Sequence, residues 1–253
     1  MIVAIIQARM GSSRLPGKVL LKINGCALLE HQINRLRKSL KINKIVIATS
    51  ILDKDQPIVE LAEQVGIECY RGSETDVLGR FYEASLNADA STIVRLTADN
   101  PLVDPEIVDK TIELFETHGA DYAANTVPPE SSSFPDGSDV EVFSSKALLR
   151  AHTEATSSCD REHVTFYFWK YSNGFKTVQL KSQKDWSMYR ITVDYPEDVK
   201  VIEFLINTLE GKNLNGSLHE VVNELESNPE ITRINSKHEF GKGWNINKIK
   251  QLM

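Results

Sequence analysis

Cysteine is scarce in this sequence: its 253 residues include only 3, at Cys26, Cys69 and Cys159. They lie far apart, form no Cys-x-x-Cys pair and show none of the cysteine–histidine spacings that are typical of zinc sites. The sequence therefore predicts neither a disulfide framework nor a structural zinc site. Unpaired cysteines fit a reducing compartment, so we expect a cytoplasmic protein.

Long hydrophobic runs and an excess of positive charge are also missing. No apolar stretch approaches the ~20 residues that span a bilayer. The apolar run at residues 2–6 has no basic segment before it and no small-residue cleavage site after it, which favours a core strand over a signal peptide. The net charge of -6 argues against a general nucleic-acid binder, which needs a basic face. We therefore expect no membrane span and no nucleic-acid partner.

What the sequence does contain is an alternation of strands and helices. Near-continuous apolar runs, typical of strands buried on both faces, alternate with amphipathic segments of helical period. We expect strands at 2–6, 44–49, 67–70 and 92–96, and helices at 57–65, 76–88 and 105–117. This repetition predicts an α/β fold with a parallel sheet between two layers of helices. In such sheets, ligands bind beyond the carboxyl ends of the strands.

The pattern changes after about residue 125. Residues 128–137 form a long irregular segment rich in proline and serine. Beyond it we expect strands at 139–143, 175–180 and 190–194, and helices at 145–154, 161–171 and 197–209. The polar stretch 223–253 shows no pattern on which to assign an element. A chain of this length suits one large α/β domain or two small ones.

A basic loop that contains two glycines follows the first expected strand. Residues 7–18 read Gln-Ala-Arg-Met-Gly-Ser-Ser-Arg-Leu-Pro-Gly-Lys. Glycine lets backbone N–H groups approach an anion, arginine adds forked donors, and lysine adds a point charge. At a strand end these residues predict a phosphate-binding loop, and a basic surface turn held by salt bridges is the alternative. The expected phosphate ligands are Arg9, Arg14 and Lys18.

The loop resembles a Walker A sequence but departs from it at two points. Five residues, not four, separate Gly11 from Gly17. Val19 stands where a serine or threonine would hold magnesium. A P-loop NTPase is therefore disfavoured.

Acidic residues lie at the ends of two other expected strands. Asp99 comes just after the strand at 92–96, and Asp194 ends the strand at 190–194. Two carboxylates facing a basic loop suit Mg²⁺, which is commonly held by few protein oxygens together with substrate phosphates. The alternatives stay open, because Asp99 in Asp-Asn-Pro also fits a turn, and acidic residues after Pro196 also fit the positive end of a helix.

A further group of polar residues lies in the second half of the chain. We interpret Asp139 and Glu141 as sharing one face of a strand, and Arg161, Glu162 and His163 as lying on a first helical turn. Together they could bind a polyhydroxylated or carboxylated acceptor. We expect the guanidinium group of Arg161 to bind a carboxylate of the acceptor. The alternative is a solvated strand face beside a helix start with local salt bridges.

Six segments between residue 1 and about residue 210 can be compared with known families. In order along the chain they read IIQARMGSSRLPGKVL, RGSETDVLGRFYEA, IVRLTADNPLVDP, DGSDVEVFSSKAL, REHVTFY and ITVDYPEDV. Together they resemble the cytidylyltransferase-like proteins of spore coat polysaccharide biosynthesis. This group is related to the CMP-Kdo and CMP-acylneuraminate synthetases.

The resemblance implies a nucleotide-diphospho-sugar transferase fold, which is GT-A-like and Rossmann-like. This fold is a three-layer sandwich with a mixed, mostly parallel sheet. The resemblance also implies CTP as donor and a homodimer. We accordingly expect one nucleotidyltransferase domain over residues 1–253, with residues 125–185 as an insertion that binds the acceptor and forms the dimer.

Carried over by position, the resemblance also implies roles for single residues. Asp99 and Asp194 match the aspartates that bind metal. CMP-Kdo synthetases have Gln-Gly-Asp where this chain has Thr97-Ala98-Asp99, which points to different nucleobase or sugar contacts at Thr97. The residues expected to bind nucleotide are Ala8, Arg9, Gly11, Ser12, Ser13, Arg14, Lys18, Asp76, Arg80 and Thr97. Those expected to act in catalysis are Lys18, Arg14 and Asp99.

The expected reaction is Mg²⁺-dependent nucleotidyl transfer. A hydroxyl of a sugar acid, such as a 2-keto-3-deoxy acid, attacks the α-phosphorus of CTP, and pyrophosphate leaves. A phosphorylated sugar or polyol is the alternative acceptor. A glycosyltransferase that uses a nucleotide-sugar is a further alternative, disfavoured because a single aspartate stands where that class commonly has Asp-x-Asp. A non-catalytic sugar-nucleotide-binding protein is also disfavoured, because both metal-binding aspartates are present.

Overall fold

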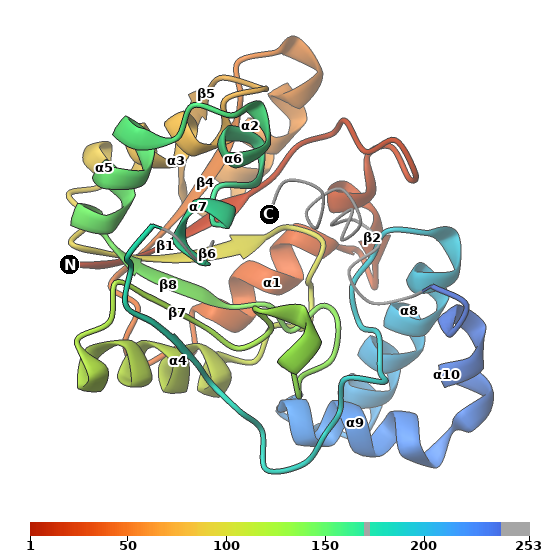
Figure 1. Ribbon diagram of the computed structural model, residues 1–253. Helices are drawn as coiled ribbons and strands as arrows, with labels where there is room; N and C mark the ends of the chain where they lie inside the picture. Colours follow the sequence, from red (N-terminus) through yellow and green to blue (C-terminus); the bar gives the residue numbers. More distant parts are fainter. Residues whose placement is uncertain (170–172, 239–253) are drawn as a thin grey trace.

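One mixed sheet forms the centre of the protein. The computed structural model describes residues 1–169 and 173–238. Within them a seven-stranded sheet has the order β5-β4-β1-β6-β8-β7-β9 (Figure 1). Its strands are β1 (Ile2–Gln7), β4 (Lys44–Ser50), β5 (Glu68–Gly72), β6 (Thr92–Thr97), β7 (Tyr122–Ala124), β8 (Glu141–Ser144) and β9 (Thr177–Gln179).

The strand directions make the sheet mostly parallel. β1 lies between β4 and β6 and is parallel to both, with Ile5 opposite Val46 on one side and Arg95 on the other. β8 is antiparallel to its two neighbours, β6 and β7. The expectation of a mixed, mostly parallel sheet is therefore confirmed.

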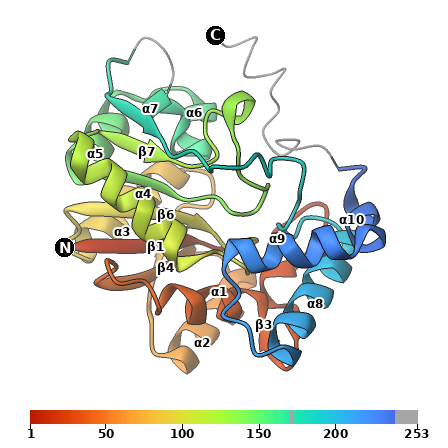
Figure 2. The same cartoon turned by 90° about the horizontal axis from the view of Figure 1, so that it is seen from below.

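Helices cover both faces of the sheet, as Figures 1 and 2 show. One face packs against α1 (Leu28–Leu36), α2 (Gln56–Val65) and α4 (Pro105–His118). The other packs against α3 (Val77–Asn87), α5 (Ser145–Glu154) and α7 (Phe166–Trp169), with α6 (Ser158–His163) beside α3. The residues of β1 alternate between the two apolar clusters, which explains why its sequence is apolar throughout.

Three further helices lie together at one side of the molecule. They are α8 (Pro196–Gly211), α9 (Leu218–Ser227) and α10 (Pro229–Asn235), and each contacts the other two (Figure 1). Apolar residues of α8 and α9 extend the cluster under α1 and α4. Among the described residues, no helix has both the length and the apolar character needed to cross a bilayer.

The expected strand at 190–194 is wrong. The structure has only an isolated bridge between Asp136 and Arg190 there. The N–H of Ile191 donates to the carbonyl of Asp136 at 2.7 Å, and that of Val193 donates to the carbonyl of Asp99 at 2.9 Å. The segment is therefore extended but held between two loops, and this position brings its last residue close to the end of β6.

The expected helix at 161–171 is also wrong, because the structure has two short helices there. α6 ends at His163, and Val164 has a φ of 54°, which a β-branched residue rarely adopts and which stops the helix. α7 then covers Phe166–Trp169, and residues 170 and 171 lie outside the described part of the chain.

Other differences concern strands and the C-terminal helices. The strand expected at 139–143 begins only at Glu141, because pairing with β6 starts at that residue. β7 was not predicted, because its three residues are too few to show a pattern. The polar stretch after residue 223 contains the end of α9 and the whole of α10.

Candidate active site

The basic loop lies at the carboxyl end of β1 and is folded by its own hydrogen bonds. The N–H of Gly17 donates to the carbonyl of Met10 at 3.0 Å, which closes the loop. Gly17 has a φ of 72°, a conformation that glycine adopts without strain, and it precedes the 3₁₀ helix Lys18–Leu20. The loop is also tied to its neighbourhood, because the N–H of Met10 donates to Asp55 at 2.7 Å.

Lys18 meets both of the aspartates that the sequence singled out. Its Nζ lies 2.9 Å from Oδ2 of Asp99 and 2.8 Å from Oδ1 of Asp194. These residues come from three separate segments, at the ends of β1 and β6 and just before α8. The structure thus brings the end of the basic loop and the two carboxylates to one point.

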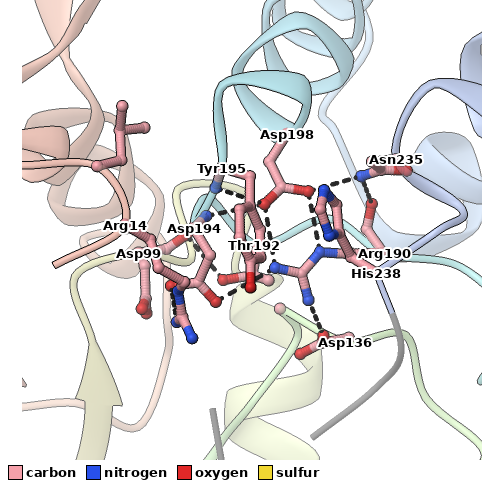
Figure 3. Close-up of polar contacts among 12 residues, drawn as sticks. Arg14, Asp99, Asp136, Arg190, Thr192, Asp194, Tyr195, Asp198, Asn235 and His238 are labelled. Carbon is pink, nitrogen blue, oxygen red and sulfur yellow. Dashed lines mark hydrogen bonds and ion pairs between the residues drawn. The ribbon is translucent and has the colours of Figure 1, made fainter. Parts of the chain in front are cut away.

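Arg14 adds a second positive charge at the same carboxylate. Its Nη2 lies 2.5 Å from Oδ1 of Asp194, and its guanidinium carbon lies 5.2 Å from the centre of the Tyr195 ring (Figure 3). Burial by itself would raise the pKa of Asp194, but Lys18 and Arg14 lower it to about 2. Burial would lower the pKa of Lys18, yet the two carboxylates raise it above its usual value. Arg14, Lys18 and Asp194 are therefore charged at neutral pH.

A cleft of about 310 Å³ opens beside this point. Besides Gln7, Val19 and Ala98, it is lined by residues that the sequence predicts for phosphate, nucleotide, metal or acceptor binding. These are Arg9, Ser12, Ser13, Arg14, Lys18, Thr97, Asp99, Glu162, His163 and Asp194. Burial lowers the pKa of His163, which is thus neutral at neutral pH.

Asp76 and Arg161 lie outside the lining of this cleft and bind each other. Arg161 donates from Nε to Oδ1 of Asp76 at 2.8 Å and from Nη2 to Oδ2 at 2.6 Å. Asp76 also caps α3 by accepting from the N–H of Gly79 at 2.9 Å. Arg161 therefore fixes α6 to the start of α3.

Asp139 and Glu141 do not share a strand face, so this interpretation of the sequence is wrong. Asp139 precedes the strand and accepts hydrogen bonds from the hydroxyl of Thr126 at 2.6 Å and from the N–H of Gly137 at 3.1 Å. Glu141 is buried, forms an ion pair with Arg95 and accepts from the hydroxyl of Tyr122 at 2.6 Å. Neither lines the cleft, and the solvated-face alternative fails for Glu141 as well.

Arg80 has unused donors inside the protein. It is 1% exposed, and its Nη1 donates to the carbonyl of Ser73 at 2.7 Å. Its Nε and Nη2 have no hydrogen-bond partner among the described residues. Burial, with the nearby charge of Arg9, lowers the pKa of Arg80 to about 10. A guanidinium with two unpaired N–H donors can bind a further hydrogen-bond acceptor.

The remaining two predicted residues belong to the loop backbone. Ala8 is buried at the end of β1 and its N–H donates to the carbonyl of Ala48 at 3.2 Å. Gly11 lies against Lys54, whose Nζ would be 3.0 Å from an added Cβ.

Arg190 belongs to the site but was not predicted from the sequence. Its Nη2 contacts Asp194 at 3.2 Å. Its place four residues before that aspartate was the available signal.

The two aspartates are a small donor set for a metal ion. Among the described residues, no group of three or more histidine, cysteine, aspartate or glutamate side chains is placed to hold one. However, Asp99 and Asp194 already share one cationic neighbour, the Nζ of Lys18. Mg²⁺ is commonly bound by one or two carboxylates, with waters and substrate phosphates completing its shell. The residues therefore fit a metal that binds together with a nucleotide.

A mixed sheet between two layers of helices, with a basic loop after its first strand, is the fold of the nucleotide-sugar transferases. A cytidylyltransferase of Leptospira borgpetersenii has the same fold with a TM-score of 0.85 and 30% identity, over 91% of this chain and 96% of that one. A CMP-2-keto-3-deoxy-manno-octonic acid synthetase in complex with CTP shares the fold with a TM-score of 0.60 and 16% identity, over 82% of this chain and 98% of that one.

Residues 3–225 match the cytidylyltransferase family, and the chain belongs to it. It is 38% identical to the uncharacterised protein MJ1063 of Methanocaldococcus jannaschii over 93% of this chain and 94% of the relative. It is 34% identical to the spore coat polysaccharide biosynthesis protein SpsF of Bacillus subtilis over 90% of this chain and 95% of the relative. The resemblance found in the sequence is therefore confirmed.

Proposed function

We propose that this protein is a CTP-dependent cytidylyltransferase that converts a sugar acid of the 2-keto-3-deoxy type into a CMP-sugar for surface polysaccharide, with release of pyrophosphate. The observation that carries the proposal is the position of Lys18, at the end of a basic loop and between Asp99 and Asp194. The similarity to SpsF supports a role in polysaccharide synthesis.

Cations in the cleft are suited to a triphosphate. Arg9, Arg14 and Lys18 all line it, and Arg9 has no ion pair with a described residue. They would bind the phosphate chain and stabilise the negative charge of pyrophosphate as it leaves. Asp99 and Asp194 would hold Mg²⁺, which when bound neutralises charge on the α-phosphate.

The chemical step joins the acceptor to the α-phosphate. A hydroxyl oxygen of the acceptor forms the new bond to phosphorus, the bond to the bridging oxygen of the β-phosphate breaks, and the hydroxyl loses its proton. Glu162 and His163 line the cleft and are our candidates for contacts with the acceptor. A neutral His163 is able to accept that proton.

Arg80 is our candidate for recognition of the base. Cytosine presents two adjacent acceptors, O2 and N3, whereas uracil has an N–H donor at position 3. Two free N–H donors on one guanidinium can donate to O2 and N3 of cytosine. With uracil, one of them would face the N–H donor at position 3. This proposal is supported by the unpartnered Nε and Nη2 of Arg80 and by its place near Arg9, a residue that lines the cleft.

Several expectations from the sequence stay predictions. They are the homodimer, the cytoplasmic location, and the role of residues 125–185 in binding the acceptor and forming the dimer. Arg161 is not free to bind the acceptor carboxylate as the sequence suggested. Its Nε and Nη2 donate to Asp76, and its Nη1 donates to the carbonyl of His152. We propose instead that Arg161 holds α6, and with it His163, in place.

Pyrophosphate release tests the proposed function. The protein is incubated with Mg²⁺, each of the four nucleoside triphosphates, and a panel of sugar acids and phosphorylated sugars or polyols. We expect release only with CTP and a sugar acid, and a CMP-linked product by mass spectrometry. A CDP-linked product would instead favour the phosphorylated acceptor, and release of UDP or GDP from a nucleotide-sugar, without pyrophosphate, would contradict the proposal.

A further inference from the structure

The C-terminal helices lie outside the cleft but reach its acidic residues. No described residue of α8, α9 or α10 lines the cleft. Figure 3 shows a polar network that leads from α10 through the start of α8 to Asp194. The network consists of Asn235, Asp198, Arg190 and Asp194, and we call it the C-terminal brace.

Asp198 is the centre of the brace. It is 0% exposed and accepts hydrogen bonds from Nε and Nη2 of Arg190 at 2.9 and 3.0 Å. It also accepts from the backbone N–H groups of Asp194 and Tyr195, both at 2.9 Å. A buried carboxylate needs such partners, because an unpaired buried charge is strongly destabilising. Asp198 thus fixes the backbone that carries Asp194 and the arginine that holds its side chain.

Arg190 determines which oxygen of Asp194 faces the cleft. Its Nη2 lies 3.2 Å from Oδ2 of Asp194, while Oδ1 faces Lys18 and Arg14. Its Nη1 forms an ion pair with Asp136, in the loop that leads to β8. A carboxylate held through one oxygen cannot rotate freely, so the other oxygen keeps its direction toward the cation.

Asn235 connects α10 to the brace. It is 3% exposed, and its Nδ2 donates to Oδ1 of Asp198 at 3.0 Å and to the backbone carbonyl of Arg190 at 3.1 Å. Both hydrogens of the amide nitrogen are therefore used. His238, just beyond α10, stacks on Tyr195 with ring centres 3.8 Å apart. The guanidinium carbon of Arg14 lies 5.2 Å from the centre of the same Tyr195 ring, so the residue just after α10 packs on a ring that also contacts a cation of the site.

We infer that Arg190 and Asn235 are positioning residues for the carboxylate of Asp194, so that α10 is a supporting part of the nucleotide site. The inference rests on the proposed function, because that function gives Asp194 a metal–triphosphate ligand. Loss of a group that orients a metal ligand typically reduces metal affinity about 10–100-fold. The brace should therefore change how much a metal strengthens nucleotide binding.

Calorimetry separates this role from a general structural one. The full chain is titrated with CTP alone and with CTP plus Mn²⁺, without acceptor. The dissociation constant of CTP without metal, divided by that with metal, gives the factor by which Mn²⁺ increases the affinity for CTP. We expect Arg190→Lys to reduce this ratio about 10-fold and Asn235→Ala about threefold. The dissociation constant for CTP alone should change less than about twofold, because the brace acts on the metal ligand.

The matched control is Lys212→Met, which removes the ion pair at 2.6 Å between Lys212, the residue after α8, and Glu224 of α9. It should leave both constants unchanged. A folded Arg190→Lys protein with the wild-type ratio would overturn the inference. If circular dichroism shows that this variant is unfolded, Asn235→Ala decides in the same way. A wild-type protein that gains nothing from Mn²⁺ would instead contradict the proposed metal site itself.

Discussion

Among single residues, Lys18 has the central position, because its ammonium group contacts the carboxylates of both Asp99 and Asp194. Its side chain is 9% exposed and supplies the positive charge between them. A divalent cation bound to the two carboxylates would have to compete with this ammonium group. Lys18 is thus expected to move toward the phosphate chain when a metal–nucleotide complex binds.

Lys18→Met should separate catalysis from metal binding. Turnover should fall by about 100-fold or more, because a charge on the triphosphate is lost. Mn²⁺ should bind more tightly to the nucleotide-free variant than to the wild type, because the two carboxylates lose their competing cation. Paramagnetic resonance of free Mn²⁺ measures the second effect. Weaker Mn²⁺ binding would contradict our placement of Lys18.

The Asp76–Arg161 pair gives a prediction for stability against pH. Burial tends to raise the pKa of Asp76, but hydrogen bonds from Arg161 and the N–H of Gly79 lower it below 3.8. A lowered folded-state pKa gives stability that is present above the unfolded pKa and lost as the pH falls through the folded one. Between about pH 5 and 3, the melting temperature of Asp76→Asn should therefore fall less than that of the wild type. Parallel curves of melting temperature against pH for the two proteins would show that the Asp76–Arg161 pair does not contribute to the pH dependence of stability.

At the scale of elements, loops and extended segments position the site more than the strands do. The chain at 191–193 is held by the carbonyls of Asp136 and Asp99, without a ladder of its own. Gly137 makes this approach possible, because it has a φ of 102° and an added Cβ would overlap the backbone of Ile191 and Thr192. One glycine therefore allows the loop before β8 to lie against the segment that carries Asp194.

Gly137→Ala should lower the free energy of unfolding by about 2–4 kcal/mol, because the cost of overlap adds to that of backbone strain. Gly119→Ala is the matched control, since Gly119 also has a positive φ of 52° but has nothing within 4 Å of an added Cβ. The control should cost about 1 kcal/mol from the backbone alone. Urea unfolding of both variants gives the comparison. Equal losses would mean that the contact with the 191–192 segment is unimportant.

The sequence predicts the fold best where the residue pattern of a segment is typical of one kind of structure only. The buried strands at β1, β4 and β6 have apolar runs that only a doubly covered sheet explains, and the loop after β1 is recognisable from its residue types. Asp139 and Glu141 were misplaced because alternation of charged and apolar residues also occurs in a buried polar network. The link from α10 to the brace could not be predicted, because the two hydrogen bonds of Asn235 join residues 37 and 45 positions apart in the chain.

At the scale of the whole molecule, binding of the nucleotide should stabilise the fold. A ligand that binds only the native state adds about 2.7 kcal/mol at 100 times its dissociation constant. With Mg²⁺ present, CTP should raise the melting temperature more than UTP, GTP or ATP at equal concentration. The preference for CTP over UTP should shrink in Arg80→Met. Equal shifts from all four nucleotides would contradict the proposed recognition of cytosine.

We expect cations from the first loop and carboxylates from two later segments to converge on one triphosphate. A crystal structure determined with CTP and Mg²⁺ tests it most directly. We predict phosphates in contact with Arg9, Arg14 and Lys18, and a metal ion bound by Asp99 and Asp194. Density for CTP at any other place on the protein, with Lys18 still between the two aspartates, would contradict this triphosphate site.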